Sequence, residues 1–140
     1  MGELWGRRAP TTVYADTIYA DILLTPGASI PIDAGADERA VYLAIGEAEI
    51  DGMPMAINTL YVLKPGVAMT LRSTGGGRVM LCGGEAFTTE RHVWWNFVSS
   101  RPDRIHQAKE DWKAGRFAKV PGDEKEFIPI PEIPKTATYP

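Results

Sequence analysis

Two histidines and one cysteine are the side chains of this 140-residue chain that metal or nucleophilic chemistry would need first: His92, His106 and Cys82. A non-haem iron site takes two or three imidazoles and a carboxylate from converging strands. Neither histidine has a second histidine at the spacing that ligands of one metal ion use. The sequence therefore predicts no metal ion, no other cofactor and no catalytic residue in this chain.

Each of these side chains also has a structural interpretation. His106 falls within a predicted helix and is expected to face solvent. His92 precedes a pair of tryptophans and is expected to be a hydrogen-bonded loop residue. Cys82 lies in an apolar strand beside Met80, where a cysteine behaves as a small hydrophobic residue. No histidine is positioned by sequence to activate its thiol.

Composition limits the possible partners. A length of 140 residues is typical of one domain. With a net charge of −3 and no long basic run, the chain is not expected to bind nucleic acid directly. One cysteine allows no internal disulfide and favours the reducing cytoplasm. No apolar run approaches the roughly 20 residues of a membrane span, and the N-terminal residues lack the apolar segment of a secretory signal.

Short apolar segments separated by Gly- and Pro-containing turns dominate the first 100 residues. An irregular arm is expected over residues 1–16. The alternation after it predicts strands, with Val41, Leu43 and Ile45 on one face of the third. The predicted strands cover residues 17–24, 29–32, 39–45, 47–50, 53–57, 59–63, 68–72 and 78–82. Many short strands at close spacing are typical of a sandwich or barrel, which we place over residues 17–100.

One helix is predicted over residues 101–115. Ser99 or Ser100 is expected to cap its start, with Asp103 completing a capping box. Pro102 suits the first turn, and Gly115 suits a left-handed residue after the last turn. One apolar stripe, which would face the rest of the protein, consists of Ile105, Ala108 and Trp112. The Pro-rich residues 116–140 are expected to form a largely extended tail.

Large aromatic residues gather around this helix. Such side chains are usual in a core but also in interfaces, because each buries a large apolar area. Both interpretations stay open at this point. The candidate interface residues are Trp94, Trp95, Phe97 and Trp112.

The segments around the helix resemble the C-terminal region of the pirin family, a group of two-domain cupin proteins. The resemblance rests on the runs WWNFVSS, QAK, DW, GRF and VPGD with EFIP, between residues 94 and 129. It extends upstream through ERAVY at residues 38–42 to about residue 15. It covers nearly the whole chain, but only the second half of a typical pirin. It implies an all-β cupin barrel, a double-stranded β-helix or jelly roll of two packed sheets, with one C-terminal α-helix packed outside.

The resemblance also bears on the metal site. Cupins share a first motif G-x5-H-x-H-x3-E-x6-G, and Gly27 and Gly46 keep its ends. The two histidine positions hold Asp33 and Gly35, and the glutamate position holds Arg39. In pirins the iron-type site belongs to the N-terminal cupin domain, which this sequence does not contain. The departure from the motif again predicts a barrel without a metal.

Four hypotheses on function follow. The first is a non-catalytic scaffold or interaction domain that docks on an N-terminal cupin partner domain or forms a homo-oligomer. The resemblance also implies that the chain is part of a pirin-type quercetin 2,3-dioxygenase, with the metal site in that separate domain. The third hypothesis is a true dioxygenase with an unusual ligand set, such as Asp33, Glu38 and His92.

A further alternative is a metal-free cupin that binds a small organic acid. Arg39 would anchor the acid, and Tyr19, Tyr42 and Met69 would form walls at the barrel mouth. The structural interpretation of Arg39 is an ion pair, because buried arginines are usually paired. Its expected partner is Asp21 or Asp33.

Overall fold

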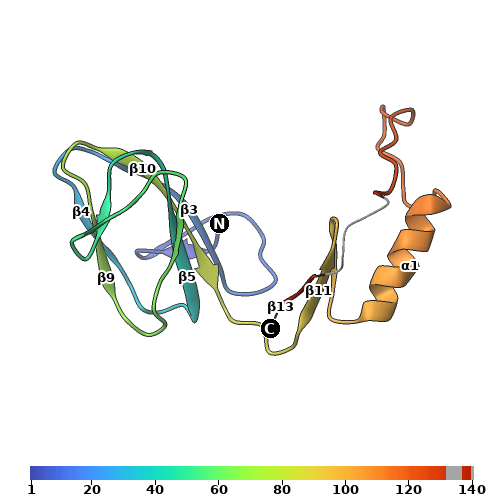
Figure 1. Ribbon diagram of the computed structural model, residues 1–140, viewed down its shortest axis with the longest axis horizontal. Coiled ribbons are helices and arrows are strands. Elements are labelled where there is room, and N and C mark those ends of the chain that lie inside the picture. Colours follow the sequence, from blue (N-terminus) through green and yellow to red (C-terminus); the bar gives the residue numbers. More distant parts are fainter. Residues whose placement is uncertain (132–136, 140) are drawn as a thin grey trace. The chain divides into compact units, whose positions relative to one another are not determined.

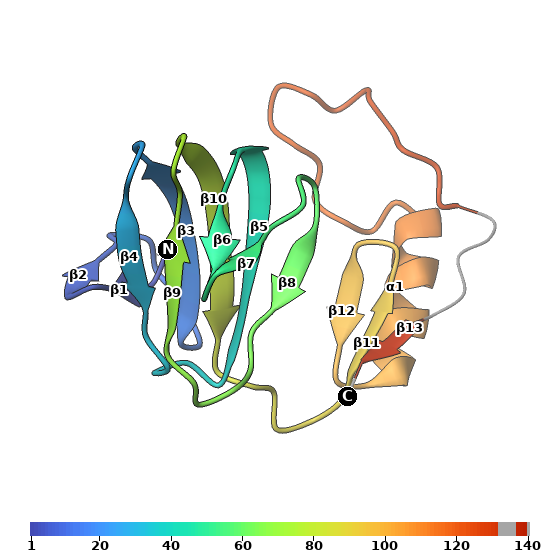
Figure 2. The same ribbon diagram turned by 60° about the vertical axis from the view of Figure 1, so that its left-hand side comes forward.

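Two antiparallel sheets form the first of two compact units, Met1–Ala86, in the computed structural model (Figures 1 and 2). The structure describes residues 1–131 and 137–139. One sheet has the order β3 (Thr17–Leu24), β10 (Gly77–Gly84), β5 (Glu38–Gly46), β8 (Leu60–Val62). The other has the order β4 (Ser29–Ile32), β9 (Met69–Arg72), β6 (Glu49–Ile50), β7 (Met53–Pro54). The predicted all-β architecture of short strands is confirmed.

The core of this unit is made by every second side chain of its strands. This is the alternation expected when one face of each sheet is buried. Val41, Leu43, Leu71 and Val79 are fully buried. The remaining buried apolar side chains are Ile22, Leu24, Ile32, Ala48, Ile50, Met55, Leu63 and Leu81.

A β-bulge in β5 corrects the predicted inward face of this strand. Val79 of β10 pairs with Leu43, but Arg78 pairs with Ile45, so Ala44 is the extra residue on β5. An extra residue moves the side chains beyond it to the opposite face of the sheet. Ile45 is accordingly 61% exposed instead of joining Val41 and Leu43 in the core.

The predicted arm at residues 1–16 contains a small hairpin. β1 (Glu3–Leu4) and β2 (Arg7–Arg8) are antiparallel strands joined at Trp5 and Gly6. The Trp5 indole Nε1 donates a hydrogen bond to the Pro31 carbonyl at 2.9 Å, and Tyr19 N donates to Met1 O at 3.0 Å. These bonds tie the arm to the strands β3 and β4.

The second unit, Phe87–Pro140, has its own small sheet and the helix. Its sheet order is β12 (Phe97–Ser99), β11 (Arg91–Trp94), β13 (Ala137–Tyr139), and the helix α1 spans Pro102–Lys113. The predicted barrel of residues 17–100 therefore extends past the boundary of the first unit, because β11 pairs with β12 and β13 and not with the barrel strands. Part of the predicted tail, residues 132–136 and 140, lies outside the described residues.

The start of α1 differs from the prediction, whereas its end agrees. Arg101 is the N-cap, without a side-chain cap, and Ser99 Oγ instead accepts a hydrogen bond from Arg101 N at 3.1 Å. The Asp103 carboxylate accepts from Arg101 Nε at 3.0 Å, so the capping box does not form. Gly115 has the predicted left-handed conformation, with φ of 66°. The helix is too short and too polar to cross a membrane.

Aromatic rings hold the second unit together. The buried ring of Trp94 stacks on Phe97 at a centroid distance of 6.2 Å. Trp112 of the helix lies edge-on to Trp95 at 5.1 Å, and Phe117 stacks on Phe97 at 5.7 Å. The same helix buries Ile105, as the predicted stripe requires. We call Trp94, Trp95, Phe97, Trp112, Phe117 and Phe127 the aromatic cluster.

Trp95 has a strained backbone within this cluster. It stands in the two-residue turn between β11 and β12 with φ of 51°. A bulky side chain is rare in this left-handed region, which costs about 1–2 kcal/mol. The ring contacts of Trp95 with Phe97 and Trp112 stabilise the turn against this cost.

The bulge in β5 gives a direct test of the fold. We expect Leu43→Ala to lower the free energy of unfolding by about 2–5 kcal/mol, because it leaves a cavity in a fully buried position. The matched control Ile45→Ala changes an exposed side chain and should cost less than about 1 kcal/mol. Denaturant unfolding followed by far-UV circular dichroism measures both. Equal losses in the two variants would contradict the bulge.

Candidate functional site

Arg39 is a buried charge at one end of the first unit. It stands on β5 in the inward row of Val41 and is 3% exposed. Its Nη1 donates a hydrogen bond to the Asp33 carbonyl oxygen at 2.6 Å. Its Nη2 donates to the carbonyl oxygens of Lys64 and Val67, both at 2.8 Å. The guanidinium therefore joins the loop before β5 to the turn between β8 and β9.

The predicted ion pair of Arg39 with Asp21 or Asp33 is wrong. Asp33 contributes its main-chain oxygen and not its carboxylate. Asp21 accepts a hydrogen bond from Arg78 Nε at 2.9 Å on the outer face of the sheet. This bond lowers the pKa of the Asp21 carboxyl below its ordinary value. Three carbonyl dipoles replace a carboxylate as the partners of the buried charge.

Gly83 makes room for the stem of Arg39. The two residues pair across β10 and β5. A Cβ atom at Gly83 would lie 2.2 Å from the Glu38 carbonyl oxygen and 3.2 Å from Arg39 Cγ. A larger residue would displace the arginine, so Gly83 is a positioning residue that sequence analysis missed. The signal was present, because Gly83 and Gly84 directly follow the predicted strand 78–82.

One nitrogen of Arg39 makes no hydrogen bond to the described residues. Its Nε is buried and has no hydrogen-bond partner among the described residues. The other nitrogens are occupied by main-chain oxygens, which leaves little capacity for a bound carboxylate.

The other predicted ligand-binding residues do not share a site with Arg39. Met69 faces inward and packs against the core. Tyr19 and Tyr42 point to the outer face of the same sheet, where Tyr19 is 50% exposed. The Tyr42 hydroxyl donates to Asn58 Oδ1 at 2.9 Å. The parity of β5 explains this, because residues 39 and 42 stand on opposite faces of one strand.

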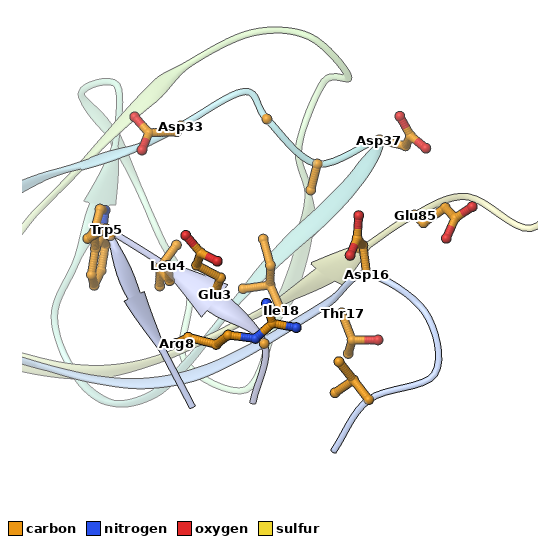
Figure 3. A pocket seen from close by; sticks show the side chains of 16 residues that line it. Glu3, Leu4, Trp5, Arg8, Asp16, Thr17, Ile18, Asp33, Asp37 and Glu85 are labelled. Carbon is orange, nitrogen blue, oxygen red and sulfur yellow. The ribbon is translucent and has the colours of Figure 1, made fainter. Parts of the chain in front are cut away.

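A cavity of about 600 Å³ lies elsewhere in the first unit, between the arm and the loops near it. In Figure 3, Asp33 and Asp37 line it from the segment that leads into β5, and Glu3, Trp5 and Arg8 line it from the arm. Its lining also includes the carboxylates of Asp16 and Glu85. The excess of carboxylates makes this cavity a poor site for an organic acid, because like charges repel.

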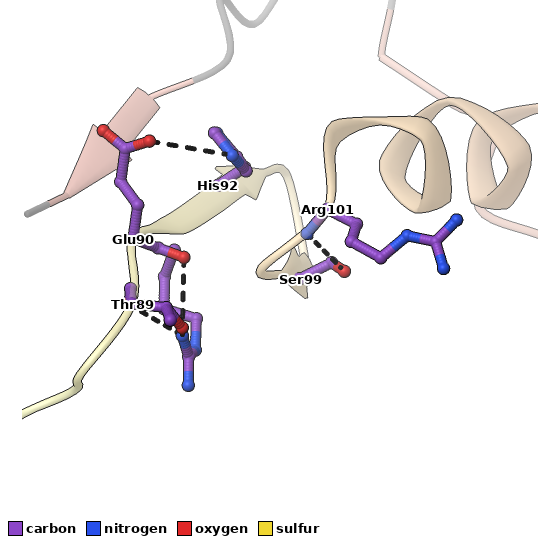
Figure 4. A network of polar contacts seen from close by, with 6 residues as sticks. Thr89, Glu90, His92, Ser99 and Arg101 are labelled. Atoms are coloured by element: carbon purple, nitrogen blue, oxygen red, sulfur yellow. Dashed lines mark hydrogen bonds and ion pairs between the residues drawn. The ribbon is translucent and has the colours of Figure 1, made fainter.

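The described residues do not fit the iron site of a cupin. His106 lies on an exposed face of α1, and Nε2 of His92 lies 4.0 Å from Glu90 Oε2 (Figure 4). Within residues 1–131, no group of three or more His, Cys, Asp or Glu side chains could hold a metal ion. Asp33 and Glu38 are exposed residues of the first unit, whereas His92 belongs to the second.

The four candidate interface residues all lie in the aromatic cluster of the second unit. Trp94 is 6% exposed, and Trp95, Phe97 and Trp112 are half-buried. The structure thus shows the packing role of these side chains. Their role in an interface stays a prediction.

Comparison with known proteins identifies the chain. The family model of the pirin C-terminal cupin domain matches residues 19–118. The chain belongs to the pirin family. A pirin-like protein from Caulobacter vibrioides is 41% identical over 131 residues, which are 94% of this chain and 45% of that protein. A Pseudomonas aeruginosa protein named "Putative quercetin 2,3-dioxygenase PA1205" is 31% identical over 137 residues, which are 95% of this chain and 44% of that protein.

Solved structures show the same fold. A crystal structure of quercetin 2,3-dioxygenase from Acinetobacter baumannii has a TM-score of 0.83 at 27% identity, covering 95% of this chain and 46% of the other. A second one has a TM-score of 0.76 at 18% identity, covering 84% and 42%. The predicted cupin fold is confirmed. The chain spans about half the length of the curated relatives that it matches.

Removal of the buried guanidinium should destabilise the first unit. We expect Arg39→Met to lower the free energy of unfolding by about 2–3 kcal/mol, because three buried carbonyls lose their donor. Arg78→Met is the matched control and should cost less than about 1 kcal/mol, because the Arg78–Asp21 pair is partly exposed. Denaturant titration followed by circular dichroism compares them. An Arg39→Met variant as stable as Arg78→Met would refute the role of Arg39.

Proposed function

We propose that this pirin-family chain is a non-catalytic cupin domain that serves as a scaffold or interaction domain and has lost the cupin metal ligands. This proposal rests on the hydrogen bonds that Arg39 makes. The residue at the glutamate position of the cupin motif is a cation, and its guanidinium donates to three main-chain oxygens. A metal cation at this place would be repelled by the guanidinium and would find no ligand there.

The partner of such a domain is a second cupin unit. About half of each matched relative has no counterpart in this chain, which supports an N-terminal cupin partner domain. In a homo-oligomer, another copy of the chain would supply this second cupin unit. The net charge of −3 disfavours a nucleic-acid partner. The single cysteine favours a cytoplasmic location.

A second candidate function is a contribution to a quercetin 2,3-dioxygenase. The Pseudomonas aeruginosa relative and the Acinetobacter baumannii structure with 27% identity carry this name, and each is about twice as long as the chain. In this case the metal would be held by a separate N-terminal cupin domain, and the present domain would support it. Both candidates give this chain the same property, which is docking without a metal of its own.

The organic-acid alternative has weaker support. Its anchor would be Arg39, and both terminal nitrogens of that residue are already engaged. The carboxylate-rich cavity does not contain Arg39 in its lining. A thermal-shift screen with carboxylates at millimolar concentration tests this alternative, and a clear stabilisation would restore it.

The absence of a metal site can be measured directly. After incubation with Fe(II) and desalting, we expect close to zero iron per chain by elemental analysis. The variant Asp33→His/Gly35→His/Arg39→Glu restores the ligands of the cupin motif and serves as a positive control. About one iron per wild-type chain, lost in Asp33→Ala, Glu38→Ala or His92→Ala, would overturn the proposal.

A further inference from the structure

The longest edge strand in the two sheets of the first unit is β3. It stands at one end of its sheet, where β10 pairs with it in an unbroken register over all eight residues. Its sequence, TIYADILL, contains no proline and no lysine. An edge of this kind presents main-chain N–H and C=O groups to which a further strand can bind.

The other three edge strands of these sheets are short, and two of them contain proline. In β4, which has four residues, the carbonyl oxygen of Pro31 also accepts the hydrogen bond of the Trp5 indole. β7 has two residues and ends at Pro54, and β8 has three residues. Proline and short length are common means of closing an edge to another strand. β3 has neither protection.

The first residue of the chain shows how a strand binds to β3. The α-amino group of Met1 donates a hydrogen bond to the Tyr19 carbonyl oxygen at 2.7 Å, and Tyr19 N donates to Met1 O at 3.0 Å. Two bonds between the same two residues define a hydrogen-bonded antiparallel pair. Gly2 follows closely, because a Cβ atom there would lie 1.5 Å from the Thr17 carbonyl oxygen. The arm therefore covers this edge from Thr17 to Tyr19.

The edge continues past Tyr19 without a partner. Every second residue of a strand directs its main-chain groups to the same side, so Asp21 and Leu23 direct theirs to the free edge as Tyr19 does. Along this edge, no described residue makes a hydrogen bond to the main-chain groups of Asp21 or Leu23. The side chain of Leu23 is 76% exposed. Two N–H and two C=O groups are therefore in position to bind one more strand.

We propose that this open edge of β3 binds an extended segment of a partner protein as an added antiparallel strand. In strand addition, main-chain hydrogen bonds supply affinity and alternating side chains supply specificity. The pair of Met1 and Tyr19 sets the register, so the C-terminal end of the segment lies next to Met1. The inference rests on the proposed role as an interaction domain and specifies what its partner contributes.

The register defines the chemistry of the segment. Counted back from Met1, its last residue faces Ala20, the next faces Asp21, and the following two face Ile22 and Leu23. Side chains opposite Ala20 and Ile22 point to the inner side of the sheet and are apolar, because Ile22 is buried there. A lysine or arginine suits the position opposite Asp21, since opposite charges on paired strands attract. Proline is excluded opposite Asp21 and Leu23, where the segment donates its own N–H groups.

Amide hydrogen exchange of the whole chain, measured by NMR, tests the proposal. The amides of Asp21 and Leu23 exchange more than about tenfold faster than that of Ile22, which faces β10. The probe is the segment Val-Thr-Val-Lys-Val joined to the N-terminus of Met1, because a joined segment has a high effective concentration. It slows the exchange of both amides more than about tenfold. The matched segment Val-Pro-Val-Pro-Val lacks both donors and leaves the rates unchanged.

A variant of β3 itself gives a second measurement. Leu23→Pro removes an N–H on the free edge and leaves the bonds to β10 in place, so it abolishes the protection that the joined segment gives to Asp21. Unchanged exchange with Val-Thr-Val-Lys-Val overturns the proposal. Amides that are already slow in the chain alone also overturn it. Slow exchange at every protein concentration means that the chain covers its own edge, and slowing that grows with concentration means that a second copy does. Iron content, measured on the same samples, tests the proposed function separately.

Discussion

The buried guanidinium of Arg39 is the constraint on which the first unit depends. A charge that is 3% exposed needs several polar partners, and the fold supplies them from two loops that are distant in sequence. A glycine is needed at position 83 beside Arg39, because any side chain there would meet the backbone of β5. The same arrangement that closes this end of the barrel also gives it a fixed positive charge. The cupin motif has a glutamate at this position, so its charge has the opposite sign.

Local patterns in the sequence predict local structure well. Alternation located the barrel strands, and glycine at position 115 marked the end of the helix, because these features depend on neighbouring residues alone. The bulge at Ala44 was not visible, since it is defined by the pairing of β5 with β10. The partners of Arg39 were missed for a similar reason. They are main-chain oxygens, which every residue has, so no residue type in the sequence indicates where they lie.

The first unit uses the two sides of one sheet for different purposes. On the inner side Val41, Leu43 and Val79 form the core, and Arg39 continues the same row. On the outer side, Tyr42 and Met80 pair with each other across β5 and β10. Up to the bulge at Ala44, the alternation of β5 keeps the two sides apart, so a substitution on the outer side need not alter the core. The predicted ligand set combined residues from both sides, since Arg39 faces inward and Tyr19 and Tyr42 face outward.

Trp95 has a consequence for how the second unit forms during synthesis. A lone two-stranded hairpin is only marginally stable in water, and the positive φ of Trp95 weakens this one further. The Trp112 ring, which compensates for this strain from the helix, leaves the ribosome after the hairpin. The hairpin between β11 and β12 therefore has no lasting structure until the helix has emerged.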